Sequence, residues 1–237
     1  MLTVLLIIGL TAAPAAAEQT PVDLELVLAV DGSASVDFEE FRLQMHGIAA
    51  AFRDPGVLEA ISSGPFGGVA VNLMVWSGLD APVAGTDWYL IRDPVSAYRF
   101  ASDVQDLDRP VRPGATAINY AIRNALTRLR TNGFNGLRRI IDVSGDGKEN
   151  NLIDALAAID VGRQEALAEG VVINGLPIMT DDPFLERYYL EYVVGGPGSF
   201  LIPARNYGDF ARAMREKLYR EISGEMLIGR SGLPPDG

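Results

Sequence analysis

Three short polar stretches hold the side chains of this sequence that could do chemistry. They are Asp31-Gly32-Ser33-Ala34-Ser35, Gly114-Ala115-Thr116, and Gly145-Asp146-Gly147. Two carboxylates and three hydroxyls can surround a hard divalent cation with oxygen ligands, and neither sulfur nor imidazole is needed. The candidate ligands are Asp31, Ser33, Ser35, Thr116 and Asp146. Because only two of them carry charge, they would at most neutralise a divalent ion, which could still accept one further anionic oxygen, such as one from an Asp or Glu of a partner protein.

An alternation of strands and helices must bring these stretches together. Continuous apolar runs predict strands, and apolar residues three and four positions apart predict the helices between them. The predicted strands are 24–30, 69–76, 88–91, 137–143, 171–176 and 199–202, and the predicted helices are 38–52, 95–107, 118–129, 152–169, 183–192 and 207–222. This order favours an α/β fold with a doubly wound, mostly parallel sheet and helices on both faces, in one domain over residues 22–222.

The polar stretches follow or precede these elements at the places where such sheets bind ligands. Ligands lie beyond the carboxyl ends of the strands, where the strand order reverses. Asp31 directly follows the first strand, Asp146 follows strand 137–143, and Thr116 precedes helix 118–129. We therefore expect the three stretches to meet at one edge of the sheet.

Together these pieces resemble the metal-ion-dependent adhesion site (MIDAS) of von Willebrand factor type A (vWA) domains. The family pattern is D-x-S-x-S after the first strand, a Thr in a Gly-containing loop before a helix, and an Asp-Gly after the fourth main strand. The resemblance covers residues 22–222 and implies a three-layer, Rossmann-like sandwich. It also implies that Ser33, Ser35 and Thr116 are hydroxyl ligands, and that Asp31 and Asp146 contact the ion directly or through water.

The resemblance further implies a binding module and not an enzyme, with Mg²⁺, Mn²⁺ or Ca²⁺ gripping an acidic residue of a protein ligand. One departure is visible, because family members commonly have Thr before the Asp-Gly and this chain has Gly145. The stretch 142–147 resembles a poorly characterised bacterial branch of exported proteins with this domain, so the family implies little about the partner.

Composition excludes several other kinds of site. The 237 residues include no cysteine and one histidine, His46, which excludes thiolate metal sites, disulfides and zinc sites with several histidines. The net charge of −11 would repel a phosphate backbone and argues against a nucleic-acid partner. We interpret His46, beside the apolar stripe of its helix, as a partly buried structural residue, and Lys148 and Glu149 as a solvated rim.

The first 17 residues are typical of a signal peptide, because an apolar run over 2–10 precedes small residues at Ala15 and Ala17. We expect an exported protein, periplasmic or secreted, and a loose Gly- and Pro-rich tail over 223–237. No later run reaches the roughly 18 apolar residues that a membrane span needs.

Other interpretations of the same residues remain open. Asp31, Ser33 and Ser35 could cap the following helix, Thr116 could cap its own helix, and 145–147 could be only a turn. A phosphatase of the haloacid dehalogenase type also has an Asp at the end of its first strand, but its usual second Asp is replaced here by Ser33. A vWA-like scaffold with a vestigial metal site is the third interpretation.

Overall fold

The computed structural model describes residues 19–81, 83–150 and 155–224. The predicted signal peptide, and residues 225–237 of the predicted tail, lie outside the described residues. No described helix combines the length and the apolar character that crossing a bilayer requires.

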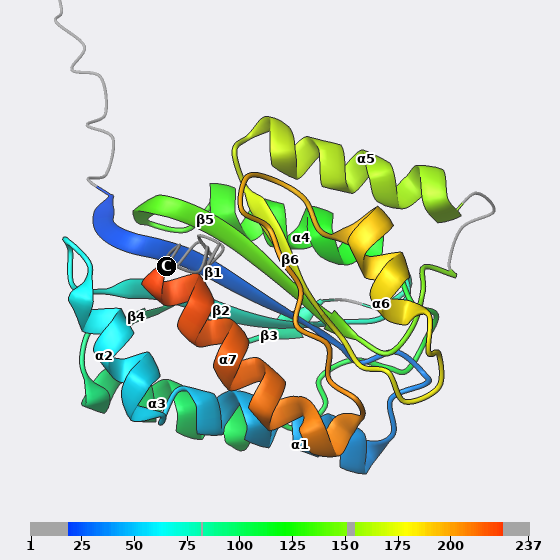
Figure 1. The fold of residues 1–237 in the computed structure, drawn as a ribbon, viewed down its shortest axis with the longest axis horizontal. Helices are drawn as coiled ribbons and strands as arrows, with labels where there is room; N and C mark the ends of the chain where they lie inside the picture. The colour runs from blue at the N-terminus through cyan, green and yellow to red at the C-terminus, as the bar shows by residue number, and fades with distance from the viewer. Residues whose placement is uncertain (1–18, 82, 151–154, 225–237) are drawn as a thin grey trace, which may run out of the picture.

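A six-stranded sheet forms the centre of the fold, with the order β3-β2-β1-β5-β6 and with β4 also paired to β2 (Figure 1). The strands are β1 (Thr20–Asp31), β2 (Val69–Trp76), β3 (Ala84–Gly85), β4 (Tyr89–Ile91), β5 (Phe134–Gly145) and β6 (Val172–Pro177). The long strands pair in parallel, and only the short β3 and β4 run antiparallel to β2. The predicted mostly parallel sheet is therefore confirmed.

Helices cover both faces of this sheet (Figure 1). They are α1 (Phe38–Ala51), α2 (Pro55–Ser63), α3 (Pro94–Gln105), α4 (Ile118–Arg130), α5 (Ala155–Ala168), α6 (Leu185–Tyr188) and α7 (Phe210–Ser223). One face carries α1, α2, α3 and α7, and the other carries α4, α5 and α6. Two separate apolar cores result, and the alternating side chains of β1 reach both: Leu26 and Leu28 enter the first, and Val27 and Ala29 enter the second.

The position of β1 creates the edge where a ligand can bind. The chain places β2 on one side of β1 and β5 on the other, so the direction of winding reverses at β1. Val30 pairs with Ser144, which brings the carboxyl ends of β1 and β5 side by side. Asp31 and the 145–147 stretch therefore begin their loops from adjacent points.

Two local predictions are corrected by the structure. The predicted strand 199–202 contributes only an isolated bridge from Leu201 to Gly175, since glycine and prolines flank this segment and prevent a regular ladder. The predicted helix 183–192 divides into α6 and a π-helical turn over Tyr189–Val193. Pro55 stands in the first turn of the short helix α2, which the Asp54 side chain caps.

Candidate metal site

The structure brings all five predicted oxygen-bearing residues together at the carboxyl edge of the sheet. The Ser33 and Ser35 hydroxyl oxygens are 3.2 Å apart, and Ser35 Oγ donates to Asp146 Oδ1 at 2.7 Å. Thr116 Oγ1 lies 3.4 Å from Ser33 Oγ. Asp31 Oδ1 accepts a hydrogen bond from the Ser33 amide at 2.7 Å. Each residue thus contacts another member of the set.

Backbone contacts between the loops fix this arrangement. The Gly32 amide donates to the Trp76 carbonyl at 2.8 Å, and the Ala34 amide donates to the Gly114 carbonyl at 2.9 Å. These bonds join the loop after β1 to the end of β2 and to the loop that carries Thr116. Together with the hydrogen bond from Ser35 to Asp146, these contacts connect all three polar stretches.

Gly145 allows the end of β5 to approach Asp31 closely. A Cβ at this position would stand 2.7 Å from Asp31 Oδ2 and 3.0 Å from the Tyr189 hydroxyl. The first contact is shorter than a Cβ atom tolerates and the second is tight, so a glycine at position 145 suits the neighbours that this chain has.

The two carboxylates of the set are close enough for the charge of Asp146 to act on Asp31. Asp31 is fully buried, and burial, followed by the charge of Asp146, raises its pKa to about 7. No described Lys or Arg forms an ion pair with either carboxylate. The guanidinium of Arg109 instead donates to the backbone carbonyls of Gly32, Ser33 and Val36.

Asp31 Oδ2 is a buried oxygen with no hydrogen-bond partner among the described residues. A buried, unpartnered carboxylate oxygen is costly. The oxygen donor set around it, with two acids and three hydroxyls, fits a hard divalent cation. No group of three or more acidic, histidine or cysteine side chains suited to a metal occurs among the described residues, so the hydroxyls are essential to this candidate site.

The capping interpretations are wrong for the predicted ligands. The side chain of Asp37, not of Ser33 or Ser35, caps α1, in a capping box with Glu40. Ala117 is the N-cap of α4, and no side chain of that residue caps the helix. Thr116 is therefore free of the capping role that we considered.

Two other interpretations of single residues are also corrected. Glu149 is not a solvated rim residue, because it is buried and its carboxylate accepts a hydrogen bond from the Asn119 amide at the start of α4 at 2.9 Å. His46 is exposed on α1 and not partly buried. Lys148 is exposed as expected, and pairs with Asp182 at 2.6 Å.

Several residues that the sequence did not point to support the site. The Tyr207 hydroxyl donates to Asp146 Oδ2 at 3.0 Å, and Asn150 Oδ1 accepts from the Thr116 amide at 2.8 Å. Gln44 Nε2 donates to the Asp31 carbonyl at 3.1 Å. Gln44 carried a usable signal, because it is a polar residue on the buried face of a helix. Tyr207 carried none, since nothing local in the sequence relates it to Asp146.

Solved structures of several proteins share this fold. Proximal thread matrix protein 1 from the mussel byssus has a TM-score of 0.58 at 14% identity, over 85% of this chain and 49% of that one. An aerotolerance-related membrane protein from Bacteroides fragilis has a TM-score of 0.51 at 18% identity, over 83% of this chain and 99% of that one. The pilus adhesin SpaC from Lactobacillus rhamnosus GG has a TM-score of 0.56 at 12% identity, over 86% of this chain and 31% of that one.

At these identities the similarities show the fold alone, which is the α/β three-layer sandwich of vWA-like proteins. The chain spans about half of the mussel protein and about a third of the adhesin. No curated protein matches the sequence. The family model described as "Protein of unknown function (DUF1194)" matches residues 21–226. Since that match covers most of the sequence, the chain belongs to this family.

Proposed function

We propose that this protein is an exported, non-enzymatic binding module that grips an acidic residue of a protein partner through a divalent cation. The cation, which we infer to be Mg²⁺ with Mn²⁺ or Ca²⁺ as alternatives, would be held by Asp31, Ser33, Ser35, Thr116 and Asp146. The observation that carries this proposal is the pair of buried carboxylates that meet three hydroxyls and form no ion pair with any described Lys or Arg.

The exposure of the site favours an external ligand. Ser35 is exposed, whereas Asp31, Ser33, Thr116 and Asp146 are buried. Solvent therefore reaches this set from the side of Ser35, and a carboxylate of a partner could approach there. A bound cation would supply the positive charge that attracts that carboxylate.

The similar proteins support the proposal without deciding it. One structure of the mussel protein is described as having a zinc-occupied MIDAS motif, and SpaC is described as a pilus adhesin. Together with the predicted signal peptide, these descriptions favour an exported protein that acts by binding.

The phosphatase alternative lacks a lysine placed to bind a phosphate beside Asp31. The two lysines of the sequence, Lys148 and Lys217, both pair with acids: Lys148 with Asp182, and the buried Lys217 with Asp142 and Glu221. Neither contacts Asp31. We therefore retain a non-catalytic function.

Thermal unfolding with and without Mg²⁺ tests the metal part of the proposal. A ligand present at 100 times its Kd stabilises the folded state by about 2.7 kcal/mol, so Mg²⁺ should raise the Tm of the wild type by several degrees relative to EDTA. Thr116→Val should lose this response. The matched control is Thr127→Val, because Thr127 lies exposed on α4 and bonds only to the Arg123 carbonyl. Equal melting of the wild type with Mg²⁺ and with EDTA would favour the vestigial-site interpretation instead.

Peptide display tests the binding part separately. Peptides selected on the Mg²⁺-loaded wild type should contain an essential Asp or Glu, and their binding should be lost in EDTA, in Thr116→Val, and when that acid becomes Asn or Gln. Selected peptides that bind equally well after this exchange would contradict recognition of a carboxylate, even if Mg²⁺ raises the Tm.

A further inference from the structure

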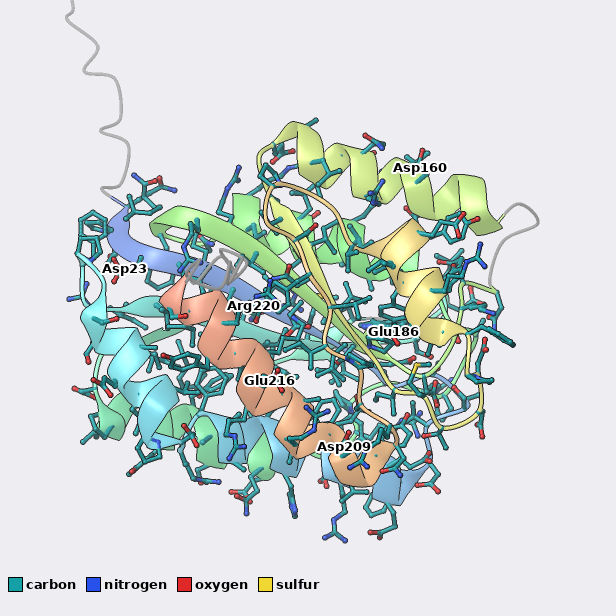
Figure 2. All side chains as sticks on the ribbon, in the orientation of Figure 1. Asp23, Asp160, Glu186, Asp209, Glu216 and Arg220 are labelled. Carbon is teal, nitrogen blue, oxygen red and sulfur yellow. The ribbon has the colours of Figure 1, made fainter. Side chains whose placement is uncertain are left out.

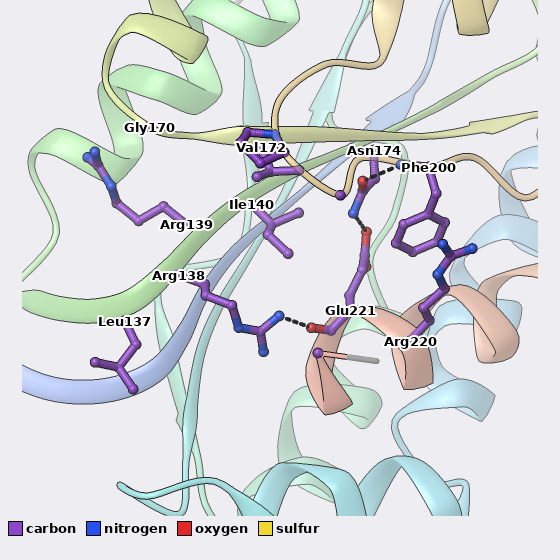
Figure 3. Close-up of a pocket in the computed structure, with 13 residues that line it drawn as sticks. Leu137, Arg138, Arg139, Ile140, Gly170, Val172, Asn174, Phe200, Arg220 and Glu221 are labelled. Atoms are coloured by element: carbon purple, nitrogen blue, oxygen red, sulfur yellow. Dashed lines mark hydrogen bonds between the residues drawn. The ribbon is translucent and has the colours of Figure 1, made fainter. Parts of the chain in front are cut away.

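A pocket of about 380 Å³ lies far from the metal site, under the carboxyl end of α7 (Figure 3). Its walls come from the amino-terminal half of β5, from β6, from the 197–200 loop and from α7. The candidate metal site stands at the opposite, carboxyl end of β5, at Gly145 and Asp146. Pockets of this size hold small organic molecules.

Most of the pocket wall is apolar. Ile140 and Val172 come from neighbouring strands, and Phe200 comes from the loop that follows. Leu137 extends the apolar wall and is 62% exposed, which is unusual for a large aliphatic side chain on a strand. A ligand with an apolar body would cover this surface.

Two guanidinium groups give the pocket positive charge. Arg220 stacks on the Phe200 ring, 3.8 Å from its centroid, and Arg138 donates to the Glu221 and Ile222 carbonyls at 2.6 and 2.8 Å. Within the part of the chain that the structure describes, neither arginine forms an ion pair with an acid. The protein as a whole is acidic, with a net charge of −11. Two arginines without an ion-pair partner in the wall of one pocket therefore stand out from the rest of the molecule.

The acid in the pocket wall, Glu221, directs its bonded carboxylate oxygen to groups other than the two arginines. Glu221 Oε1 accepts from Lys217 Nζ at 2.5 Å and from Asn174 Nδ2 at 2.8 Å. It shares this lysine with Asp142, and among the described residues it forms no ion pair with Arg138 or Arg220. Arg139, by contrast, is matched by Glu169 at 3.9 Å. Arg220 lies near the carboxyl end of α7, well separated from Asp209 at the amino end (Figure 2). Its guanidinium is therefore the group available to an incoming anion.

We propose that this pocket binds a small amphipathic anion, namely a free aliphatic carboxylic acid whose carboxylate pairs with Arg220 and whose chain covers Leu137, Ile140 and Val172. Guanidinium groups bind carboxylates through paired hydrogen bonds. Stacking on Phe200 orients the Arg220 group and leaves its edge available for such bonds. This site does not depend on the cation at the other end of the sheet.

Calorimetric titration of the full chain with decanoate, and with decan-1-ol as its uncharged analogue, tests the proposal. Decanoate should bind the wild type saturably, with equal Kd in Mg²⁺ and in EDTA, and decan-1-ol should bind about tenfold more weakly or worse. Arg220→Gln should raise the Kd for decanoate by about tenfold. Arg215→Gln is the matched control, because Arg215 lies on the same helix outside the pocket wall, and should leave the Kd unchanged.

A second variant keeps the test decisive if Arg220→Gln folds poorly. Leu137→Glu places an acid on an exposed part of the pocket wall and should also weaken decanoate binding. The proposal would be overturned by the absence of saturable decanoate binding to the wild type. It would also be overturned by equal affinity for decan-1-ol, or by equal loss of affinity in Arg220→Gln and Arg215→Gln.

Discussion

Tyr207 shows how a single residue outside the predicted set can shape the candidate metal site. Its hydroxyl donates to Asp146 Oδ2, while Ser35 donates to Oδ1, so both oxygens of this carboxylate are fixed. Burial, together with the negative charge of Asp146, raises the pKa of Tyr207, and the hydroxyl therefore stays protonated and donates.

Tyr207→Phe should lower the free energy of unfolding of the metal-free protein by about 1.5–3 kcal/mol, the range for a hydrogen bond to a charged group. Urea unfolding in EDTA measures this. Tyr192→Phe is the control, because its hydroxyl bonds only to the exposed Glu191 next to it, and it should change stability by less than about 0.5 kcal/mol. Equal losses of unfolding free energy in the two variants would show that the hydrogen bond from Tyr207 to Asp146 contributes no more to stability than the exposed one from Tyr192.

The close approach of the loops at Gly145 allows a second prediction about a single residue. Gly145→Ala would place a methyl group 2.7 Å from Asp31 Oδ2 and should destabilise the fold by about 1–3 kcal/mol, as overpacking does. The control is Gly133→Ala, where nothing lies within 4 Å of the added atom. Chemical denaturation of both variants checks this, and a neutral Gly145→Ala would mean that the loop ends can move apart freely.

All five oxygen-bearing residues of the site could be predicted because each stands at the end of a recognisable strand or the start of a helix. Their supporting residues Tyr207 and Asn150 could not, since a hydrogen bond between distant loops leaves no periodic pattern. Glu149 was misinterpreted because a charged residue after a strand looks solvated, whereas its carboxylate caps α4.

At the scale of elements, α7 is tied to the sheet by a buried charged cluster. Lys217 Nζ lies 2.8 Å from Asp142 Oδ1 on β5 and 2.5 Å from Glu221 Oε1 on its own helix. All three residues are buried. The sequence contained a signal for this cluster. Lys217 and Glu221 stand next to Met214 and Leu218 in the apolar stripe of the helix, which indicates that both charged side chains are buried.

Lys217→Met should destabilise the protein by about 3–5 kcal/mol, because removing one partner leaves buried acids without a counter-charge. Arg215→Met, an exposed change on the same helix, should cost less than about 0.5 kcal/mol. Guanidinium chloride unfolding compares the two. Similar small losses would indicate that water or protonation compensates the acids without the lysine.

The same cluster predicts a dependence of stability on pH. Burial raises the pKa of Asp142 to about 7, opposed by Lys217 and reinforced by Glu221. The folded state then holds a proton that the unfolded chain releases near pH 4, so stability falls as pH rises from about 4 to about 7 and levels off above. Asp142→Asn should make this fall shallower in EDTA, and Asp31, whose pKa is also raised to about 7, should account for the part that remains. If the plots of unfolding free energy against pH were parallel for Asp142→Asn and the wild type, the pH dependence could not be assigned to Asp142.

At the scale of the whole molecule, the three-layer α/β architecture could be predicted from the sequence, because strands of a buried parallel sheet appear there as continuous apolar runs. The irregular backbone of segment 199–202 could not be predicted, since the segment is apolar like a strand but pairs with β6 only through the isolated bridge from Leu201 to Gly175. The pocket under α7 could not be predicted either, because it depends on how the end of a helix sits over two strands far from it in sequence.

The central claim is that five oxygen-bearing side chains from three loops hold one divalent cation. Crystals grown with Mn²⁺ test it most directly, through anomalous scattering from the ion. We expect one strong anomalous peak between the hydroxyls of Ser33, Ser35 and Thr116 and the carboxylate of Asp146, and we expect this peak to be absent from Thr116→Val crystals. If the three loops were ordered in wild-type crystals at saturating Mn²⁺ and no anomalous peak appeared among them, the claim of a divalent-cation site would be contradicted.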